Sequence, residues 1–281
     1  MFQTHGYLKL KLAPPTELFA NADTFFNRSL SYKKGFEGEV NGKLAPHLGY
    51  RGTELRKELL VYRKSLVKKL PPELVCMETE LERLGTLVLE IMKEILKTLG
   101  KDIGTLDQAL DYVAPSKSEL PFNSFIEVFR YDMTPGRFVS WGSLCGTKRN
   151  QVEPVELGTG NQVEQDKYRI ACGEHRDTGL LTVIPFSTFP GLEVFNWSTG
   201  KWHMEETPGE CIIFPGELFG WFTNTDIPAL CHRVVLPLRP GECRYSVPME
   251  LLPNPFYRNE RSETSIDEMS RLARGLVSTN N

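Results

Sequence analysis

Apolar and polar residues are arranged in two different patterns along the chain, and the change falls near residue 122. Between Glu73 and Leu99, apolar residues recur every three or four positions, which is typical of an amphipathic helix that packs on a sheet. Two prolines precede this segment, and Gly100 is a residue type that often ends a helix. The first part of the chain, residues 1–121, is therefore predicted to be rich in helix.

Other segments outside the strand-rich region also have recognisable patterns. Residues 6–12 alternate apolar and polar positions, which predicts a half-buried strand. A second helix is predicted from Thr16 through Phe26, whereas residues 36–52, which are polar and rich in glycine, predict a loop. Near the end of the chain, residues 265–277 have the periodicity of an amphipathic helix that begins with capping-box spacing.

After residue 122 the chain consists of short runs rich in valine, isoleucine and aromatic residues, separated by glycine, proline, asparagine and aspartate. Such runs predict strands, and many short strands at regular spacing indicate a sandwich or a barrel. Residues 145–168 are polar and unpatterned, which indicates a surface insertion. The predicted strands cover residues 123–132, 137–144, 169–173, 180–186, 191–196, 201–206, 210–215, 219–223, 230–236 and 243–250.

Composition narrows the classes of partner. Apolar residues make up 40% of the 281 residues and charged residues 25%, as in a globular protein, and the net charge of -3 argues against nucleic acid. We expect no signal peptide and no membrane partner, since no apolar run approaches the roughly 20 residues of a membrane span. The six cysteines lack zinc-site spacing, which favours a reducing, cytoplasmic setting. We expect a monomer, since no sustained heptad pattern is present.

The strongest chemical signal is a pair of residues two positions apart and a third residue far along the chain. His175 and Asp177 are two positions apart, so on an extended strand both side chains project to the same side. His232, on another predicted strand, can complete the set. Two histidines and one carboxylate on one face of an iron ion leave three coordination positions open for a bidentate cosubstrate and O2. The three residues are therefore candidate iron ligands.

A second pair lies shortly after His232. Arg244 and Ser246 also share a strand face by their spacing. A guanidinium group matches a carboxylate through two parallel hydrogen bonds, and a neighbouring hydroxyl adds a donor. The pair therefore predicts a socket for a small dicarboxylate whose other end chelates the metal.

These motifs, in this order and at this spacing, resemble the isopenicillin N synthase-like branch of the iron(II)/2-oxoglutarate-dependent dioxygenases. The resemblance is specific over residues 173–250 and looser before residue 122. The residues that carry it are His175-Arg176-Asp177-Thr178-Gly179, Pro190-Gly191-Leu192, Gly200-Lys201-Trp202, Pro208-Gly209, Thr223-Asn224, His232-Arg233-Val234 and Arg244-Tyr245-Ser246.

The resemblance implies an α+β fold with a mainly β core, a double-stranded β-helix (jelly roll) flanked by helices. It implies one oxygenase domain over residues 1–281, with a helix-rich part at 1–121, a jelly-roll core at 122–252 and a C-terminal helix at 253–281. The implied iron ligands are His175, Asp177 and His232. Arg244 and Ser246 are implied to bind 2-oxoglutarate, with Fe(II) and O2 as further requirements and ascorbate as the reductant in vitro.

The chain departs from the family pattern where a tyrosine often contacts 2-oxoglutarate, because Thr134 stands at that position. Tyr131 or Tyr168 could supply the contact instead, or the contact could be lost. Arg51, Arg130 and Phe214 are candidate substrate contacts. Of these, Phe214 replaces a polar residue of the family's pocket.

The expected activity is abstraction of a hydrogen atom from a small molecule of specialised metabolism, followed by hydroxylation, desaturation or oxidative cyclisation. An amino-acid derivative, as in kainoid-type pathways, is one named substrate class. The alternatives are a protein-modifying hydroxylase and an oxidase that needs no 2-oxoglutarate, like isopenicillin N synthase. A catalytically inactive binding module is disfavoured, because both motifs are intact.

Overall fold

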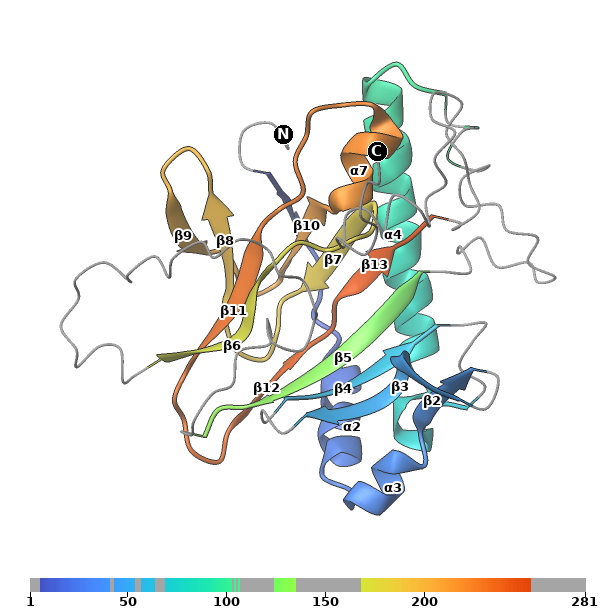
Figure 1. The fold of residues 1–281 in the computed structure, drawn as a ribbon, viewed down its shortest axis with the longest axis vertical. Coiled ribbons are helices and arrows are strands. Elements are labelled where there is room, and N and C mark those ends of the chain that lie inside the picture. Colours follow the sequence, from blue (N-terminus) through green and yellow to red (C-terminus); the bar gives the residue numbers. More distant parts are fainter. Residues whose placement is uncertain are drawn as a thin grey trace, which may run out of the picture.

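The computed structural model describes residues 6–40, 43–53, 57–63, 69–102, 104, 106, 124–134 and 168–253. Within these residues the chain forms one nine-stranded and one four-stranded antiparallel sheet (Figure 1). The larger sheet contains β1 (Leu8–Lys11), β2 (Glu37–Val40), β3 (Lys43–Thr53), β4 (Lys57–Tyr62), β5 (Phe125–Asp132), β7 (Leu181–Pro185), β10 (Glu210–Pro215), β12 (Cys243–Ser246) and β13 (Met249–Leu251). The smaller sheet contains β6 (Tyr168–His175), β8 (Leu192–Asn196), β9 (Lys201–Met204) and β11 (His232–Pro237).

Strands that are distant in sequence are neighbours in both sheets. The larger sheet has the order β1-β10-β7-β13-β5-β4-β3-β2, with β12 also paired to β5, and the smaller has the order β6-β11-β8-β9. Neither sheet closes on itself within the described residues. The expected mainly β core with flanking helices is therefore confirmed, and β5 is the strand on which β4, β12 and β13 converge.

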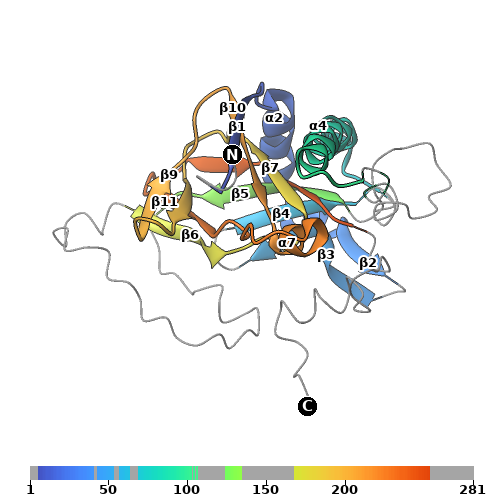
Figure 2. The same cartoon turned by 90° about the horizontal axis from the view of Figure 1, so that it is seen from above.

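Helices cover one face of the larger sheet (Figure 2). They are α2 (Thr16–Phe26) and α4 (Met77–Thr98), with the short α3 (Leu30–Lys34) and a 3-10 turn at Pro72–Leu74 beside them. Ile126 and Val128 of β5 point into this helix side of the core. The apolar stripe of α4 is buried as its spacing predicts, since Leu81, Leu84 and Val88 are at most 1% exposed.

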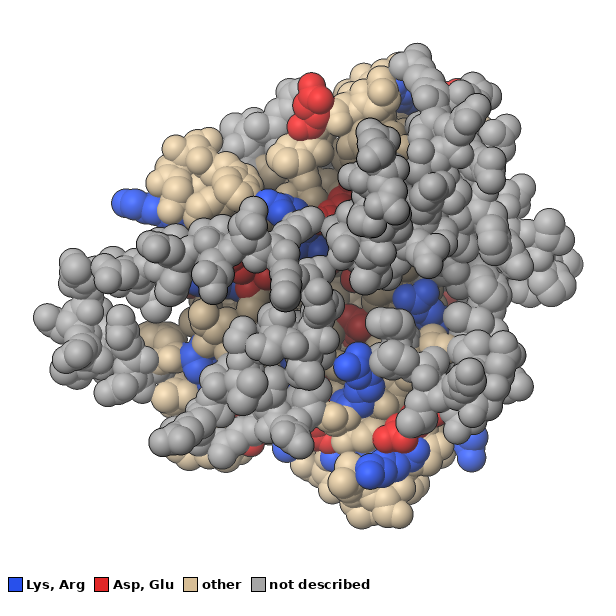
Figure 3. Space-filling view, viewed as in Figure 1, with Lys and Arg blue, Asp and Glu red and all other residues tan. Residues whose placement is uncertain are grey.

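The smaller sheet packs on the opposite face of β5. Tyr131 and Met133 form an apolar cluster with Ala171 of β6 and with Val234 and Leu236 of β11. Alternation along β5 thus turns even-numbered residues toward the helices and odd-numbered residues toward the smaller sheet. We call the odd-numbered side, together with the residues that pair with it, the inner face of the larger sheet. Figure 3 shows acidic and basic side chains gathered over β4, β5 and β13.

The prediction of a loop at residues 36–52 is wrong, because β2 and β3 form an antiparallel hairpin there. The glycines that suggested a loop serve close pairing of two backbones instead. Gly49 has a φ of +66°, and a Cβ at this position would collide with the carbonyl oxygen of Phe36. Glycine is the residue that tolerates both a positive φ and so close an approach of another backbone. The next strand, β4, was not predicted from the sequence and extends the same sheet.

The prediction of a strand at residues 219–223 is also wrong, because α7 (Glu217–Thr223) is a helix. Leu218, Phe219 and Phe222 are buried on one side of it. A short apolar run does not distinguish a buried strand from a helix turn. The predictions for residues 137–144, 145–167 and 265–277 lie outside the described residues. No helix in the described part of the chain is both long and apolar enough to span a membrane.

Candidate metal centre

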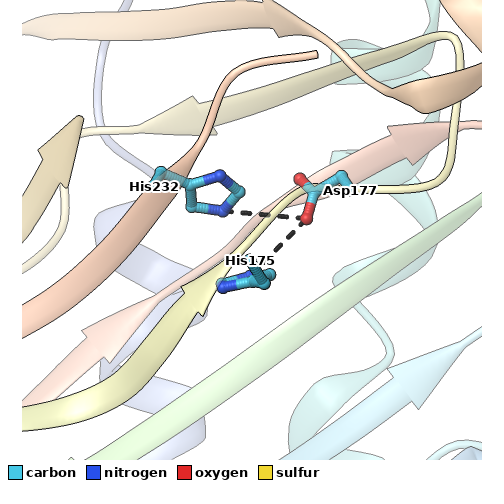
Figure 4. Close-up of side chains that lie close together, drawn as sticks. All are labelled: His175, Asp177 and His232. Carbon is cyan, nitrogen blue, oxygen red and sulfur yellow. Dashed lines mark ion pairs between the residues drawn. The ribbon is translucent and has the colours of Figure 1, made fainter. Parts of the chain in front are cut away.

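Strand pairing brings the three predicted ligands together from two neighbouring strands and the turn that follows one of them (Figure 4). His232 begins β11 and lies directly opposite His175 at the end of β6. Asp177 follows two residues after His175. One ligand atom from each residue lies within 4.8 Å of the others, and no other such cluster of His, Cys, Asp and Glu occurs among the described residues. The His175 and His232 rings are 4.2 Å apart between centroids.

Backbone carbonyl groups orient both imidazole rings. His175 Nδ1 is 2.8 Å from the Gly173 carbonyl oxygen, and His232 Nδ1 is 3.3 Å from that of Leu230. When Nδ1–H donates to a carbonyl oxygen, Nε2 carries the free lone pair that a metal needs. The two Nε2 atoms lie 3.6 Å and 3.7 Å from Asp177 Oδ1. All three ligand atoms therefore face one common point.

The Asp177 carboxylate is oriented by a hydroxyl group. Thr182 Oγ1 donates a hydrogen bond of 2.6 Å to Asp177 Oδ2, which leaves Oδ1 directed toward the histidines. The backbone of the same turn is held by α7, because the N–H groups of Glu217 and Leu218 donate to the carbonyl oxygens of Asp177 and Thr178. Two imidazole nitrogens and one carboxylate oxygen on one side are the donor set of a non-haem Fe(II) site with open positions.

Electrostatics favour the neutral form of His175. Burial and the neighbouring His232 lower the pKa of His175 to about 4, although 41% of its side chain is solvent-exposed. A neutral imidazole is the form that coordinates a metal. His232, by contrast, has a side chain that is 4% exposed and packs against the ring of Phe214, 4.8 Å away between centroids.

Arg244 lies in the interior, with 1% of its surface exposed. Its Nε donates to the Phe189 carbonyl oxygen over 2.8 Å, and its Nη2 donates to Ser187 Oγ over 2.7 Å and to the Glu206 carboxylate over 3.0 Å. Nη1 is buried and has no hydrogen-bond partner among the described residues. A buried donor without a partner costs free energy unless a ligand satisfies it, so this atom fits the distal carboxylate of 2-oxoglutarate.

Ser246 and Tyr131 lie beside this guanidinium. Register places Arg244 opposite Tyr131 and Ser246 opposite Phe129, all on the inner face. Ser246 Oγ is 3.2 Å from Ser187 Oγ. The Arg244 guanidinium lies 5.5 Å from the centroid of the Tyr131 ring, and Lys57 lies 5.4 Å from it. Burial raises the pKa of Tyr131 to about 12, so its hydroxyl is a hydrogen-bond donor at neutral pH.

The three residues suggested as substrate contacts occupy different places. Phe214 is fully buried against His232 and so packs on a candidate metal ligand. Arg51 pairs with Leu59, which places it on the inner face. Arg130 lies on the opposite face of β5, where its Nη1 is 2.6 Å from Glu58 Oε2. The structure therefore removes Arg130 from the neighbourhood of the centre.

Further charged residues on the inner face were not identified from the sequence. Lys57 and Arg63 belong to this face because Lys57 pairs with Tyr131 and Arg63 stacks 4.5 Å from the Phe125 ring. Glu127 lies between these positions on β5, and Glu250 pairs with Phe125. The sequence shows that Glu127 and Glu250 lie within predicted strands. Which face of the sheet these charged residues occupy follows only from the pairing of each strand with its neighbours.

Two carboxyl groups near the centre have raised pKa values. Burial raises the pKa of Glu127 to about 7, and the charge of Asp177 acts in the same direction while Lys57 opposes it. Burial also raises the pKa of Glu250 well above its usual value, and Asp177 is the next cause. Both carboxyl groups therefore lie within electrostatic reach of the candidate ligand Asp177. Perturbed groups of this kind gather at functional sites.

Comparison with known proteins agrees with this geometry. Residues 155–253 match the family model of the 2OG-Fe(II) oxygenase superfamily. A 2-oxoglutarate-Fe(II) type oxidoreductase of Aspergillus fumigatus is 33% identical over 89 residues, which are 31% of this chain and 26% of that protein. The chain thus spans about a quarter of the length of this relative.

Solved structures of similar fold extend the likeness to nearly the whole chain. A full-length Neurospora crassa protein, solved in complex with alpha-KG, has a TM-score of 0.66 at 20% identity, covering 96% of this chain and 86% of its own. A dioxygenase for auxin oxidation from rice has a TM-score of 0.61 at 17% identity, covering 96% and 78%. The part of the chain that holds the candidate metal ligands therefore matches the 2OG-Fe(II) oxygenase superfamily, and nearly the whole chain shares the fold of these solved structures.

Proposed function

We propose that this protein is an Fe(II)- and 2-oxoglutarate-dependent dioxygenase that acts on a small molecule. The observation that carries the proposal is the convergence of His175 Nε2, His232 Nε2 and Asp177 Oδ1 on one point, with ligand atoms within 4.8 Å of one another. A buried Arg244 with one unsatisfied donor on the adjoining inner face supports the cosubstrate. Bound Fe(II), 2-oxoglutarate and O2 would supply the oxidant that abstracts a hydrogen atom from the substrate.

The residues of this chain have separate parts in that reaction. The two histidines and Asp177 hold the metal on one side only, which leaves the other side for cosubstrate and O2. Arg244 Nη1 and the Ser246 hydroxyl would bind the distal carboxylate of 2-oxoglutarate, with Tyr131 beside them. The apolar cluster of Tyr131, Ala171 and Leu236 excludes water from this end of the site.

The inner face also supports a polar, charged substrate. It carries both carboxylates (Glu127, Glu250) and cations (Arg51, Lys57, Arg63), where a purely structural core would be apolar. An amino-acid derivative of specialised metabolism has groups of both signs and would match this pattern. Hydroxylation, desaturation and oxidative cyclisation all begin with the same hydrogen abstraction, and the outcome depends on how the substrate is held.

The test is formation of succinate from 2-oxoglutarate with Fe(II) and ascorbate, measured with amino-acid, terpenoid and phenolic candidates. We expect stimulation by one class of candidate in the wild type and in His203→Ala, which changes an exposed histidine on β9. His175→Ala should abolish it. Turnover of a substrate without 2-oxoglutarate would favour an oxidase, and failure of the wild type to bind Fe(II) or 2-oxoglutarate would refute the proposal.

We also propose that the chain acts as a monomer in a reducing, cytoplasmic setting, with a small molecule as its partner. The support for the reducing setting is that Cys76, Cys172, Cys211, Cys231 and Cys243 are all unpaired thiols among the described residues. Light scattering after size-exclusion chromatography checks the first part, and a stable dimer at micromolar concentration would contradict it.

A further inference from the structure

The buried cation of Arg244 already has a counter-ion within the protein. The Glu206 carboxylate lies 3.0 Å from Arg244 Nη2, and the two side chains are 2% and 1% exposed. Both Glu206 oxygens approach the same nitrogen, at 3.0 Å and 3.1 Å. In so dry an environment, an ion pair of this kind fixes geometry strongly, and the loss of one partner leaves the other charge uncompensated.

Glu206 is itself anchored by the backbone of the smaller sheet. Its Oε2 accepts hydrogen bonds from the N–H groups of Gly191, at 2.5 Å, and Leu192, at 2.7 Å. Leu192 begins β8, whereas Arg244 lies on β12 of the larger sheet. The carboxylate therefore bridges the two sheets and fixes the position of the guanidinium between them.

The neighbours of Arg244 leave one arm of the guanidinium available. Nε is taken by the Phe189 carbonyl oxygen, and Nη2 by Ser187 and Glu206, whereas Nη1 is buried and has no partner among the described residues. Ser187 accepts from Nη2 and donates its own hydrogen to Ser246 Oγ. The hydrogen of the Ser246 hydroxyl is thereby left for another acceptor. Nη1 and Ser246 are thus the two donors that this network leaves for a ligand.

We propose that Glu206 is a positioning residue of the cosubstrate site, which holds Arg244 so that Nη1 and not the paired Nε/Nη2 edge meets the distal carboxylate, with Ser187 setting the direction of the Ser246 hydroxyl. This inference rests on the proposed function, because it takes 2-oxoglutarate as the ligand of Arg244. It replaces the bidentate fork expected from the sequence by recognition through one guanidinium arm and one hydroxyl.

The experiment measures anaerobic binding of 2-oxoglutarate to the Fe(II)-loaded protein by the charge-transfer absorption of the complex. The variants are Glu206→Gln and Ser187→Ala. Glu205→Gln is the matched control, because Glu205 is the adjacent residue and pairs with Lys9 of β1 instead of Arg244. A second probe is 2-oxopentanoate, which has the same carbon chain and 2-oxo acid end but lacks the distal carboxylate.

In Glu206→Gln, an amide NH2 replaces one of the two oxygens that face the Nη2 donors, so the guanidinium loses its fixed position. We expect the Kd of 2-oxoglutarate to rise about tenfold, as for other residues that orient a binding group. The Kd of 2-oxopentanoate and of Fe(II) should stay within about twofold. Ser187→Ala should also raise the Kd of 2-oxoglutarate without changing that of 2-oxopentanoate. Glu205→Gln should leave the Kd of both 2-oxo acids unchanged.

Two outcomes would overturn the inference. One is an unchanged or lower Kd of 2-oxoglutarate in both variants, and the other is an equal rise in the Kd of 2-oxoglutarate and of 2-oxopentanoate. If Glu206→Gln does not fold, Ser187→Ala decides alone. Wild-type protein that binds Fe(II) but not 2-oxoglutarate would refute the proposed function instead, so the two failures are distinguishable. The Tm of the metal-free protein gives a readout without cofactors, and it should fall in Glu206→Gln because buried Arg244 loses its counter-ion.

Discussion

At the scale of single residues, the centre depends on groups that hold the ligands as much as on the ligands. Each imidazole is oriented by a carbonyl oxygen, and Asp177 by a hydroxyl. Such partners fix which ligand atom faces the metal and how basic it is. The centre should therefore respond to changes at residues that touch no metal.

Thr182→Val removes the hydroxyl that donates to Asp177 Oδ2 and keeps the shape of the side chain. We expect the affinity for Fe(II), or for Mn(II) as a stand-in, to fall about tenfold, since the carboxylate is no longer oriented. Titration calorimetry measures this. Thr223→Val is the control, because its buried hydroxyl bonds to the Phe219 carbonyl oxygen on α7. Equal metal affinity in both variants and the wild type would contradict the prediction.

Glu127 should make the metal-free protein less stable as pH rises. Its folded pKa of about 7 lies above the unfolded value of roughly 4.3. Between these values the folded state keeps a proton that the unfolded state has lost, so this stabilising contribution is present below about pH 4.3 and disappears as pH passes through 7.

Glu127→Gln removes this titration. The Tm of the metal-free variant should fall less steeply than that of the wild type between about pH 5 and about pH 8. Glu90→Gln, at an exposed position of α4, should follow the wild type. Parallel curves for all three proteins would show that Glu127 titrates at its ordinary pKa.

At the scale of elements, the turn that carries Asp177 is shaped by the junction of β10 and α7. The first N–H groups of α7 donate to carbonyl oxygens of Asp177, Thr178 and Gly179. These are donors that a helix start cannot satisfy internally. Gly216, just before α7, allows the two segments to approach, because a Cβ there would collide with the Gly179 carbonyl oxygen and lie 2.9 Å from that of Asp177.

Gly216→Ala should push the ligand turn away from α7. We expect a loss of about 1–3 kcal/mol in the free energy of unfolding, as for other overpacked sites, together with weaker metal binding. Urea denaturation and metal titration measure the two effects. Gly104→Ala is a suitable comparison, because the atoms nearest to its Cβ would belong to the side chain of Asp102, at 3.2 Å or more. Wild-type metal affinity in Gly216→Ala would show that the turn does not depend on this contact.

At the scale of the whole molecule, the larger sheet is a platform between helices and the smaller sheet. One face packs on α2 and α4, and the other packs on the smaller sheet, whose strands β6 and β11 carry His175 and His232. Tyr245, next to Arg244 on β12, donates its hydroxyl hydrogen to Asp23 of α2 over 2.7 Å, which ties the helices to the strand that bears the proposed cosubstrate site. A mutation on the helix side should nevertheless change the stability of the protein without changing its metal affinity.

Leu84→Ala should lower stability while leaving metal affinity unchanged. Leu84 of α4 is fully buried in the helix-side core, so its truncation should lower the free energy of unfolding by about 2–5 kcal/mol. Metal affinity should be unchanged at temperatures where the variant is folded. Thr86→Ala, on the exposed side of α4, should stay within about 0.5 kcal/mol of the wild type. A large loss of metal affinity in Leu84→Ala would show that the helix layer also sets the geometry of the centre.

The sequence by itself determined the fold class, the long helix and most strands, because apolar periodicity records which face of an element is buried. Its failures are local. Glycines at 38 and 49 suggested a loop where two strands pair closely, and the apolar run at 219–223 suggested a strand in place of α7.

The sequence also brought His175, Asp177 and His232 into one hypothesis, since the spacing of the first two favours one side of an extended segment and their context is specific. Only the tertiary structure could add Thr182, Ser187 and Glu206, or separate Arg51 from Arg130. The physical reason is that spacing along a strand fixes which face a side chain occupies, whereas pairing between distant strands decides what that face meets.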